Sequence, residues 1–318
     1  MLLILTNSLD VTADYLGSVL ARRNVPFLRL DTDTALQHVG VEYEAGGPLV
    51  RLGGEWHPPE RFTNIWYRRP ERLRQVGAAQ TPESKFVVEE WAEALEGFLA
   101  HIEEARWMNH PSRNVLASHK LEQLSRANSF GLRTPETLVT QDPDRFREFY
   151  TRHRGAVIVK PMASGYVERH EEERDSLVYT NRVGPEHLND LDDLRGCPTL
   201  FQRLIEKACD VRITVVDGDM YSVELTAREP DGSQRCDIRR NNMDDVSYRA
   251  ITLPDEVRAK VAALVASYRL RFAAIDMAVT PAGEWVYFEV NPNGQWAWLD
   301  LCGATNIAAS FVSAFSTR

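Results

Sequence analysis

Two stretches near the C-terminal end, FAAIDMAV at residues 272–279 and WVYFEVNPN at residues 285–293, decide the fold. Each is a run of apolar, strand-forming residues that is interrupted by an acid, Asp276 in the first and Glu289 in the second. Because side chains alternate across a strand, Glu289 and Asn291 are expected on one face. The opposite face is then expected to carry the apolar residues Val286, Phe288 and Val290.

These strands predict a metal site. If they are neighbours, Asp276, Glu289 and Asn291 bring three oxygen ligands together. Magnesium prefers such hard oxygen ligands and keeps its remaining positions for water and nucleotide phosphates. The alternative is that the acids form ion pairs at strand edges. Three polar residues inside otherwise apolar strands favour magnesium over that alternative.

The rest of the second half is crowded with strand-like segments and has one long helical pattern, at 255–269. This composition predicts an α+β unit that is built on an antiparallel sheet. The strand-like segments lie at residues 156–160, 177–182, 199–204, 211–216 and 220–226.

The N-terminal part has a different pattern. Leu2–Leu5 predicts a strand, a helical pattern starts at Val11, and Val25–Leu30 predicts a second strand. Strand, helix and strand within some thirty residues predict a parallel α/β unit. No G-x-G-x-x-G follows the first strand, so a dinucleotide site is not expected there. The segment GGEWHPPE at 53–60 predicts a turn.

The middle of the chain joins the two patterns. A helical period over 83–106 is broken at Asn109-His110-Pro111, where the first domain boundary is expected. A helix capped by Ser112 or Asn114 is expected to end at Gly131. A strand at 137–140, a helix at 144–153 and an exposed, charged flap at 164–175 follow.

Composition excludes several classes of protein. The 318 residues carry a formal net charge of −9 and a pI near 5.5, which argues against a general nucleic-acid or membrane-surface binder. The four cysteines have no CxxC spacing, so neither a disulfide framework nor a zinc site is expected. No apolar run approaches the roughly 20 residues of a membrane helix, and the start lacks a basic signal region, so a cytoplasmic protein is expected.

Two lysines and one strand end suggest a nucleotide site. Lys120 and Lys160 stand in different segments, and each alone would more often be a surface residue, but lysine also binds phosphate as a point charge. The segment FQRLIE at 201–206 can present strand-edge donors and acceptors to an adenine. Asp210 can hold ribose hydroxyls, and Arg212 can neutralise a phosphate during transfer.

Taken in order, these residues resemble the ATP-grasp family from about residue 110 to the C-terminus. The resemblance implies two α+β subdomains that hold ATP, magnesium at Asp276, Glu289 and Asn291, and an acyl phosphate made from a carboxylate substrate. It also implies three further roles. Lys120 and Lys160 would bind phosphates. The adenine would lie against Gln202, Arg203, Leu204 and Ile205, with Glu206 or Asp210 at the ribose. The phosphoryl group and acyl phosphate would face Arg212, Arg239 and Asn241.

A narrower resemblance covers nearly the whole chain. The motifs WYRRP at 66–70, MNHP at 108–111, KLEQL at 120–124, DIR at 237–239 and NPNGQW at 291–296 resemble the graspetide maturases, which are related to the microviridin ligases. That group joins Asp or Glu side chains of a ribosomal precursor peptide to Ser, Thr or Lys side chains. Arg68 and Arg69 would contact the acidic peptide, or form surface ion pairs. Trp296 and Trp298 would line the substrate entrance, or pack in the core.

The predicted architecture is α/β and α+β: an ATP-grasp fold preceded by an α/β pre-ATP-grasp domain. The domains are expected at 1–110, 111–198 (the lid) and 199–318 (the catalytic subdomain). The expected partners are ATP, Mg²⁺ and a precursor peptide with a leader and an acidic core, without nucleic acid or membrane; a homodimer is compatible with the sequence. Two rivals remain: a ligase that adds a free amino acid to a small molecule or protein terminus, and a nucleotide-dependent binding protein without catalysis.

Overall fold

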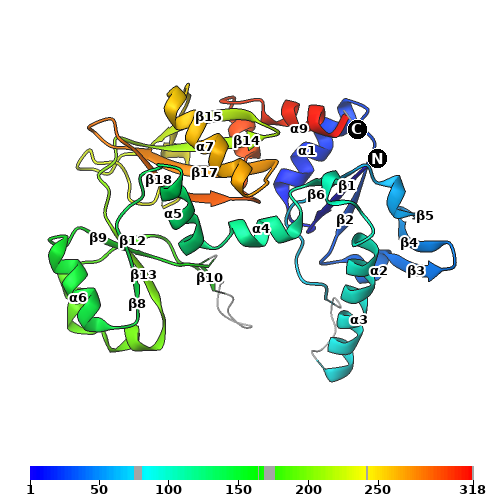
Figure 1. The fold of residues 1–318 in the computed structure, drawn as a ribbon, viewed down its shortest axis with the longest axis horizontal. Helices are drawn as coiled ribbons and strands as arrows, with labels where there is room; N and C mark the ends of the chain where they lie inside the picture. Colours follow the sequence, from blue (N-terminus) through cyan, green and yellow to red (C-terminus); the bar gives the residue numbers. More distant parts are fainter. Residues whose placement is uncertain (75–80, 164, 168–175, 241–242, 317–318) are drawn as a thin grey trace.

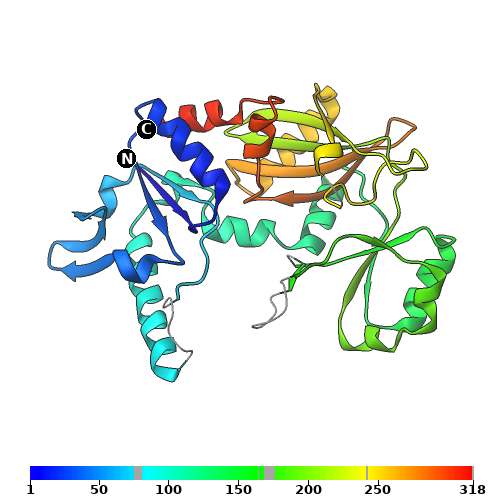
Figure 2. The same ribbon diagram turned by 180° about the vertical axis from the view of Figure 1, so that it is seen from behind.

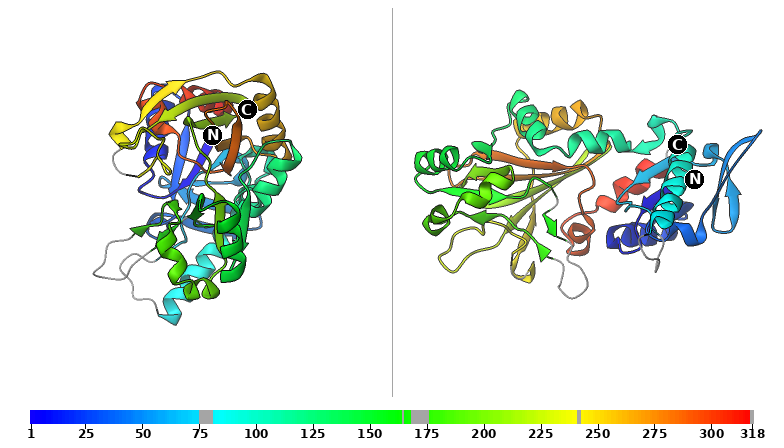
Figure 3. Two further views of the ribbon diagram at one scale, coloured as in Figure 1. Left: turned by 90° about the vertical axis from the view of Figure 1, so that its left-hand side faces the viewer. Right: turned by 90° about the horizontal axis from the view of Figure 1, so that it is seen from below.

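A computed structural model describes residues 1–74, 81–163, 165–167, 176–240 and 243–316. Asn241 and most of the predicted flap at 164–175 lie outside these residues. The described chain forms an N-terminal, a central and a C-terminal sheet, each with its own helices (Figures 1 and 2). A view from below shows the N-terminal part at one end and the other two sheets at the opposite end (Figure 3). None of the described helices is long and apolar enough to cross a membrane.

The N-terminal sheet is parallel, as the strand-helix-strand pattern predicted. Strand β1 is buried along its whole length and pairs on both sides. Helix α1 (Val11–Arg22) begins at Asp10, whose carboxylate accepts hydrogen bonds from the amides of Thr12 and Ala13. The strand order is β2 (Phe27–Asp31), β1 (Leu2–Thr6), β6 (Asn64–Tyr67) and β7 (Trp107–Met108).

A small antiparallel sheet beside it was not predicted. The segment 53–60 is not only a turn, because Glu55–His57 forms a strand that pairs with its predecessor. The three strands are β3 (Gly40–Glu44), β4 (Gly47–Leu52) and β5 (Glu55–His57).

The helix that was expected over 83–106 is shorter in the structure. Helix α3 (Pro82–Leu99) ends before Ile102, whose amide bonds the carbonyl of Leu99 and whose side chain turns into the core beside Trp107. Two short helices complete this part, namely α2 (Ala35–His38) and the 3-10 turn Glu104–Arg106.

Two helices, rather than the single one expected, form a connector between the N-terminal sheet and the rest. Helix α4 (Pro111–Ala117) is capped by His110, not by Ser112 or Asn114. The His110 ring accepts a hydrogen bond from the backbone amide of Ser112. The first helix ends before Ser118, and the second, α5 (Lys120–Ser129), begins two residues later. Gly131, with φ of +73°, ends the connector as predicted.

The central sheet is antiparallel, with helix α6 (Pro143–Arg152) packed on it. Its strand order is β12 (Asn181–Arg182), β9 (Val157–Lys160), β13 (Thr199–Arg203) and β8 (Thr137–Thr140). Strand β13 pairs with both β9 and β8, so it lies inside the central sheet. A separate ribbon joins β10 (Tyr166–Val167) and β11 (Ser176–Leu177).

The C-terminal sheet is antiparallel, as predicted, and shares a core with the N-terminal domain. Trp296 is 0% exposed and stacks on Phe311, so it packs in this core and does not line an entrance. The sheet order is β16 (Ser247–Ala250), β15 (Asp219–Thr226), β14 (Cys209–Val216), β17 (Phe272–Val279) and β18 (Trp285–Asn291). Its helices are α7 (Asp255–Ser267), α8 (Ala297–Leu301) and α9 (Ile307–Ser316), the last lying beside α1 (Figures 1 and 2).

Candidate active site

A row of three charged side chains crosses the C-terminal sheet. In the antiparallel register, Arg212 on β14 lies opposite Asp276 on β17, which in turn lies opposite Glu289 on β18. Opposed residues in such sheets have Cβ atoms about 4.5–5.5 Å apart, so the three side chains share one face. Nη1 of Arg212 donates to Oδ1 of Asp276 at 2.7 Å. The row therefore holds a fixed positive charge beside two carboxylates.

The predicted alternation of side chains between the two faces of β18 does not hold before Glu289. The register with β17 shifts between Asp276 and Met277, so one extra residue, Phe288, is accommodated in β18. As a result Tyr287 and Val290 pack in the same core, although a regular strand would place them on opposite faces. The irregularity lies directly beside the predicted metal ligands, where β-bulges commonly re-aim a side chain.

The three predicted metal ligands are brought together. Nδ2 of Asn291 donates to Oδ2 of Asp276 at 3.2 Å and to Oε1 of Glu289 at 3.1 Å. No group of three or more His, Cys, Asp or Glu side chains in the described part of the chain could hold a metal ion. The set offers two carboxylates and one amide, which fits magnesium if water and phosphate supply the other ligands. Asn291 would then have to turn its carbonyl oxygen to the ion.

Burial and nearby charges shift the pKa values of both acids. Burial raises the pKa of Asp276 to about 6; Arg212 opposes this shift and Glu289 adds to it. Burial acts in the same direction on Glu289, but Lys160 and Lys120 outweigh it and hold its pKa below the usual value. Two neighbouring carboxylates repel each other, so a divalent cation between them would offset this repulsion.

Both predicted phosphate-binding lysines lie near this acid pair. Nζ of Lys120 donates to the carbonyl of Pro161 at 2.8 Å and lies 3.5 Å from Oε2 of Glu289. Lys160 ends strand β9, directly before that proline. Burial lowers the pKa of Lys160, although the charge of Glu289 opposes the shift. The structure thus brings together two cations, one from helix α5 and one from the central sheet, and both act on one carboxylate.

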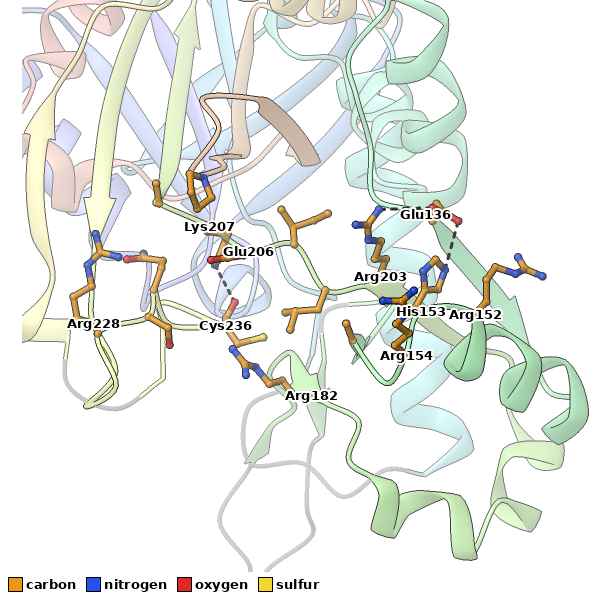
Figure 4. A pocket seen from close by; sticks show the side chains of 18 residues that line it. Glu136, Arg152, His153, Arg154, Arg182, Arg203, Glu206, Lys207, Arg228 and Cys236 are labelled. Carbon is orange, nitrogen blue, oxygen red and sulfur yellow. Dashed lines mark hydrogen bonds and ion pairs between the residues drawn. The ribbon is translucent and has the colours of Figure 1, made fainter.

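A cavity of about 970 Å³ opens at the hinge between the central and C-terminal sheets (Figure 4). The hinge itself, residues 204–208, forms part of its wall. Among the described residues, the lining does not extend to Asp276, Glu289 or Asn291. The hinge cavity and the predicted metal ligands are therefore separate features of the described structure. Its wall also carries five arginines: Arg152, Arg154, Arg182, Arg203 and Arg228.

The predicted adenine and ribose residues differ in where they point. Leu204, Ile205 and Glu206 line the cavity, as does Arg203, which lies 3.9 Å from Glu136 (Figure 4). The side chain of Gln202 is 1% exposed and turns away, donating to the Thr137 hydroxyl at 2.9 Å.

Asp210 is already engaged by other side chains. Nζ of Lys207 lies 2.8 and 2.9 Å from its two carboxylate oxygens. Nε2 of Gln234 adds a hydrogen bond of 2.8 Å. Of the two acids predicted for the ribose, Glu206 therefore has the freer position.

Arg239 lies in a turn that holds it by two contacts. Its guanidinium pairs with Asp237 at 2.7 Å and lies over the ring of Tyr179. The hydrogen bonds that Arg239 donates to Asp237 raise the pKa of Arg239, and the charges of Glu289 and Asp276 add to the shift, so its charge acts on the acid pair. Sequence analysis missed Asp237 as the partner, although its spacing of two residues was a usable signal.

The two arginines of the WYRRP motif have opposite environments. Arg68 is 0% exposed; it lies 3.2 Å from Oδ2 of Asp10 and donates to the carbonyl of Asn293. Burial lowers the pKa of Arg68 to about 10, although Asp10 opposes the shift. A peptide could contact this side chain only after the surrounding contacts had opened. Arg69 is exposed and remains a predicted peptide contact.

We compared the chain with known protein families, curated proteins and solved structures. No protein-family model matches the chain, and no curated protein gives a significant match. Solved structures align with nearly all of it. Macrocyclase MdnC from Microcystis aeruginosa MRC, bound with precursor peptide MdnA, has a TM-score of 0.86 and 24% identity, and the match covers 99% of both chains. Macrocyclase MdnB from the same organism has a TM-score of 0.79 and 28% identity over 100% of this chain and 99% of the other.

A third neighbour is a RiPP-associated ATP-grasp ligase from Chryseobacterium gregarium, in complex with ADP and a leader and core peptide. It has a TM-score of 0.83 and 25% identity over 99% of this chain and 96% of its own. The fold is that of the ATP-grasp ligases among these solved structures. Within that class, the chain resembles the macrocyclases and RiPP-associated ligases from end to end, which confirms the resemblance seen in its motifs.

Proposed function

We propose that the chain activates Asp or Glu side chains of a ribosomal precursor peptide as acyl phosphates and joins them to Ser, Thr or Lys side chains. The products would be ester or amide cross-links. One observation carries the proposal: the alignment with MdnB and with the peptide-bound Chryseobacterium ligase includes the N-terminal domain as well as the nucleotide-binding part.

The nucleotide would be ATP, held with magnesium. Lys120 and Lys160 would bind its phosphates, since both ammonium groups act on Glu289 at the expected metal site. Leu204 and Ile205 would hold the adenine and Glu206 the ribose, because these residues line the hinge cavity. Magnesium at Asp276, Glu289 and Asn291 would neutralise phosphate charge during the transfer.

Two arginines are suited to stabilising negative charge on the transferred group. Arg212 lies in the same cross-strand row as the acids, and Arg239 acts on them from the turn that follows β15. Preorganised cations of this kind act most strongly where water is excluded. The role predicted for Asn241 remains a proposal from the family resemblance.

The proposed partner is a precursor peptide with a leader and an acidic core. Macrocyclase MdnC is bound with a precursor peptide, and the Chryseobacterium ligase is in complex with a leader and core peptide. The exposed Arg69 together with Arg239 offers cations for an acidic core. The rival function, ligation of a free amino acid or small molecule, has less structural support. D-cycloserine synthetase DcsG aligns with a TM-score of only 0.58 and 16% identity.

Mass spectrometry of a candidate precursor incubated with enzyme and MgATP tests the proposal. Each cross-link removes one water, and fragmentation would map the loss to an acid and a Ser, Thr or Lys. The Glu289→Gln enzyme is the control for uncatalysed dehydration. Consumption of ATP with free amino acids, without dehydration of any acidic peptide, would favour the small-molecule ligase.

A further inference from the structure

The side-chain amide of Gln123 uses its full hydrogen-bonding capacity. Its Nε2 donates to the carbonyls of Ala117 at 2.6 Å and Val290 at 3.0 Å. Its Oε1 accepts from the amide of Val290 at 3.0 Å and from the hydroxyl of Tyr287 at 3.3 Å. An amide group offers two donors and two acceptor lone pairs, so every site is filled. The side chain is 2% exposed, which makes each of these bonds costly to lose.

The backbone that Gln123 binds lies between two predicted metal ligands. Val290 stands between Glu289 and Asn291, and β18 is the edge strand of its sheet. An edge strand leaves a row of amide and carbonyl groups without a neighbouring strand. Gln123 bonds both backbone groups of Val290, as a neighbouring strand would. It does so just after the register shift, where regular pairing with β17 has been interrupted.

Two further side-chain amides, from Asn109 just before α4 and from Asn114 on α4, bind the chain directly after β18. Nδ2 of Asn109 donates to the carbonyl of Pro292 at 3.0 Å, and Nδ2 of Asn114 donates to Oδ1 of Asn293 at 3.1 Å. Helices α4 and α5 run from the N-terminal sheet to β18 (Figures 1 and 2). Asn114 on α4 and Gln123 on α5 donate side-chain hydrogen bonds to Asn293 and Val290, just after and within the end of that strand. Lys120 is three residues before Gln123 on the same helix.

We infer that Gln123 is a positioning residue for the metal and nucleotide site. It fixes the backbone that carries Glu289 and Asn291 relative to the helix that carries Lys120. This inference rests on the proposed function for the existence of that site, but not for the identity of the substrate. Residues that orient metal ligands typically change metal affinity or activity by roughly 10- to 100-fold when they are replaced.

The test uses Gln123→Met, which keeps the length of the side chain and removes all four hydrogen bonds. Glu122→Gln is the matched control. Glu122 sits beside Gln123 on α5 but binds Arg126 and Tyr268, not β18. The probe is Mn²⁺ in the presence of ADP, with free Mn²⁺ followed by electron paramagnetic resonance. Thermal unfolding of each protein is measured in parallel.

Gln123→Met is expected to weaken Mn²⁺ binding roughly 10-fold or more, while Glu122→Gln binds as the wild type does. Unchanged Mn²⁺ affinity in Gln123→Met would overturn the inference, even if its melting temperature fell, because the residue would then serve stability alone. An equal loss in Glu122→Gln would also overturn it. If Gln123→Met does not fold, Gln123→Glu takes its place; it keeps the acceptor for the Val290 amide but loses the two donated hydrogen bonds, and Mn²⁺ binding as in the wild type would then overturn the inference. The Mn²⁺-binding experiment needs no peptide. Its result therefore does not depend on whether the enzyme cross-links a peptide.

Discussion

Arg212 donates to Asp276 at 2.7 Å across two neighbouring strands, so one carboxylate predicted to bind magnesium is already paired with a cation. The other carboxylate, Glu289, is influenced by Lys120 and Lys160. Three cations, Arg212, Lys120 and Lys160, therefore act on these two carboxylates. Removing one of them changes the ionisation of the rest, so variants that keep the shape of the side chain are the most informative.

Glu289→Gln should abolish turnover while the fold is kept. The substitution preserves size but removes the negative charge that would bind the metal, so a loss on the order of 100-fold or more in ADP release is expected. Glu284→Gln is the matched control, because Glu284 lies in the turn between β17 and β18 and pairs with the exposed Arg133. Undiminished activity in Glu289→Gln would remove the metal assignment.

Lys120→Ala and Lys160→Ala should each weaken ATP binding, by roughly 10- to 100-fold for the loss of one charged hydrogen bond. Isothermal titration with a non-hydrolysable ATP analogue would measure this. Lys260→Ala is the control, since that lysine pairs with Glu256 on the surface of α7. Normal affinity in either active-site variant would show that this lysine does not bind phosphate.

Sequence patterns were sufficient where local chemistry and tertiary packing agree. The apolar runs around Asp276 and Glu289 predicted both strands, and the register then placed the acids directly opposite each other. The parallel unit at the N-terminus followed from its short strands and helix. Gly131 marked the end of the connector because only a glycine readily adopts its positive φ.

The remaining features depend on partners that are distant in sequence. Nothing local reveals that Arg68 would be buried against Asp10, or that Gln202 would turn to Thr137. The register shift beside Glu289 is likewise set by pairing with β17, so the alternation that grouped Val286 and Phe288 with Val290 does not hold before Glu289. The KLEQL motif contains Gln123 but gave it no role, since the role of a buried glutamine is recognised only from the edge strand that it binds.

Arg68 and Arg69 should behave differently although they are adjacent. Arg68→Ala leaves the buried Asp10 without its ion-pair partner, and breaking such a buried pair costs about 3–5 kcal/mol of unfolding free energy. Arg69→Ala removes an exposed side chain and should leave the melting temperature unchanged while weakening binding of an acidic peptide. Differential scanning calorimetry and fluorescence anisotropy separate the two effects. Equal melting temperatures in both variants would contradict the structural role of Arg68.

Arg239→Ala should reduce cross-linking far more than nucleotide affinity. Its guanidinium is held by Asp237 and Tyr179 where its charge acts on Glu289 and Asp276, so it is placed to stabilise charge that develops during acyl transfer. Removing one such stabilising group typically lowers kcat by roughly 100- to 1,000-fold. Single-turnover dehydration of an acidic, Thr- or Lys-containing peptide measures the loss, and ADP titration measures affinity. Arg249→Ala, on the exposed strand β16, is the control for a lost surface charge. Wild-type cross-linking by Arg239→Ala would assign that stabilisation to other groups, and a matching loss of ADP affinity would make Arg239 a nucleotide-binding residue instead.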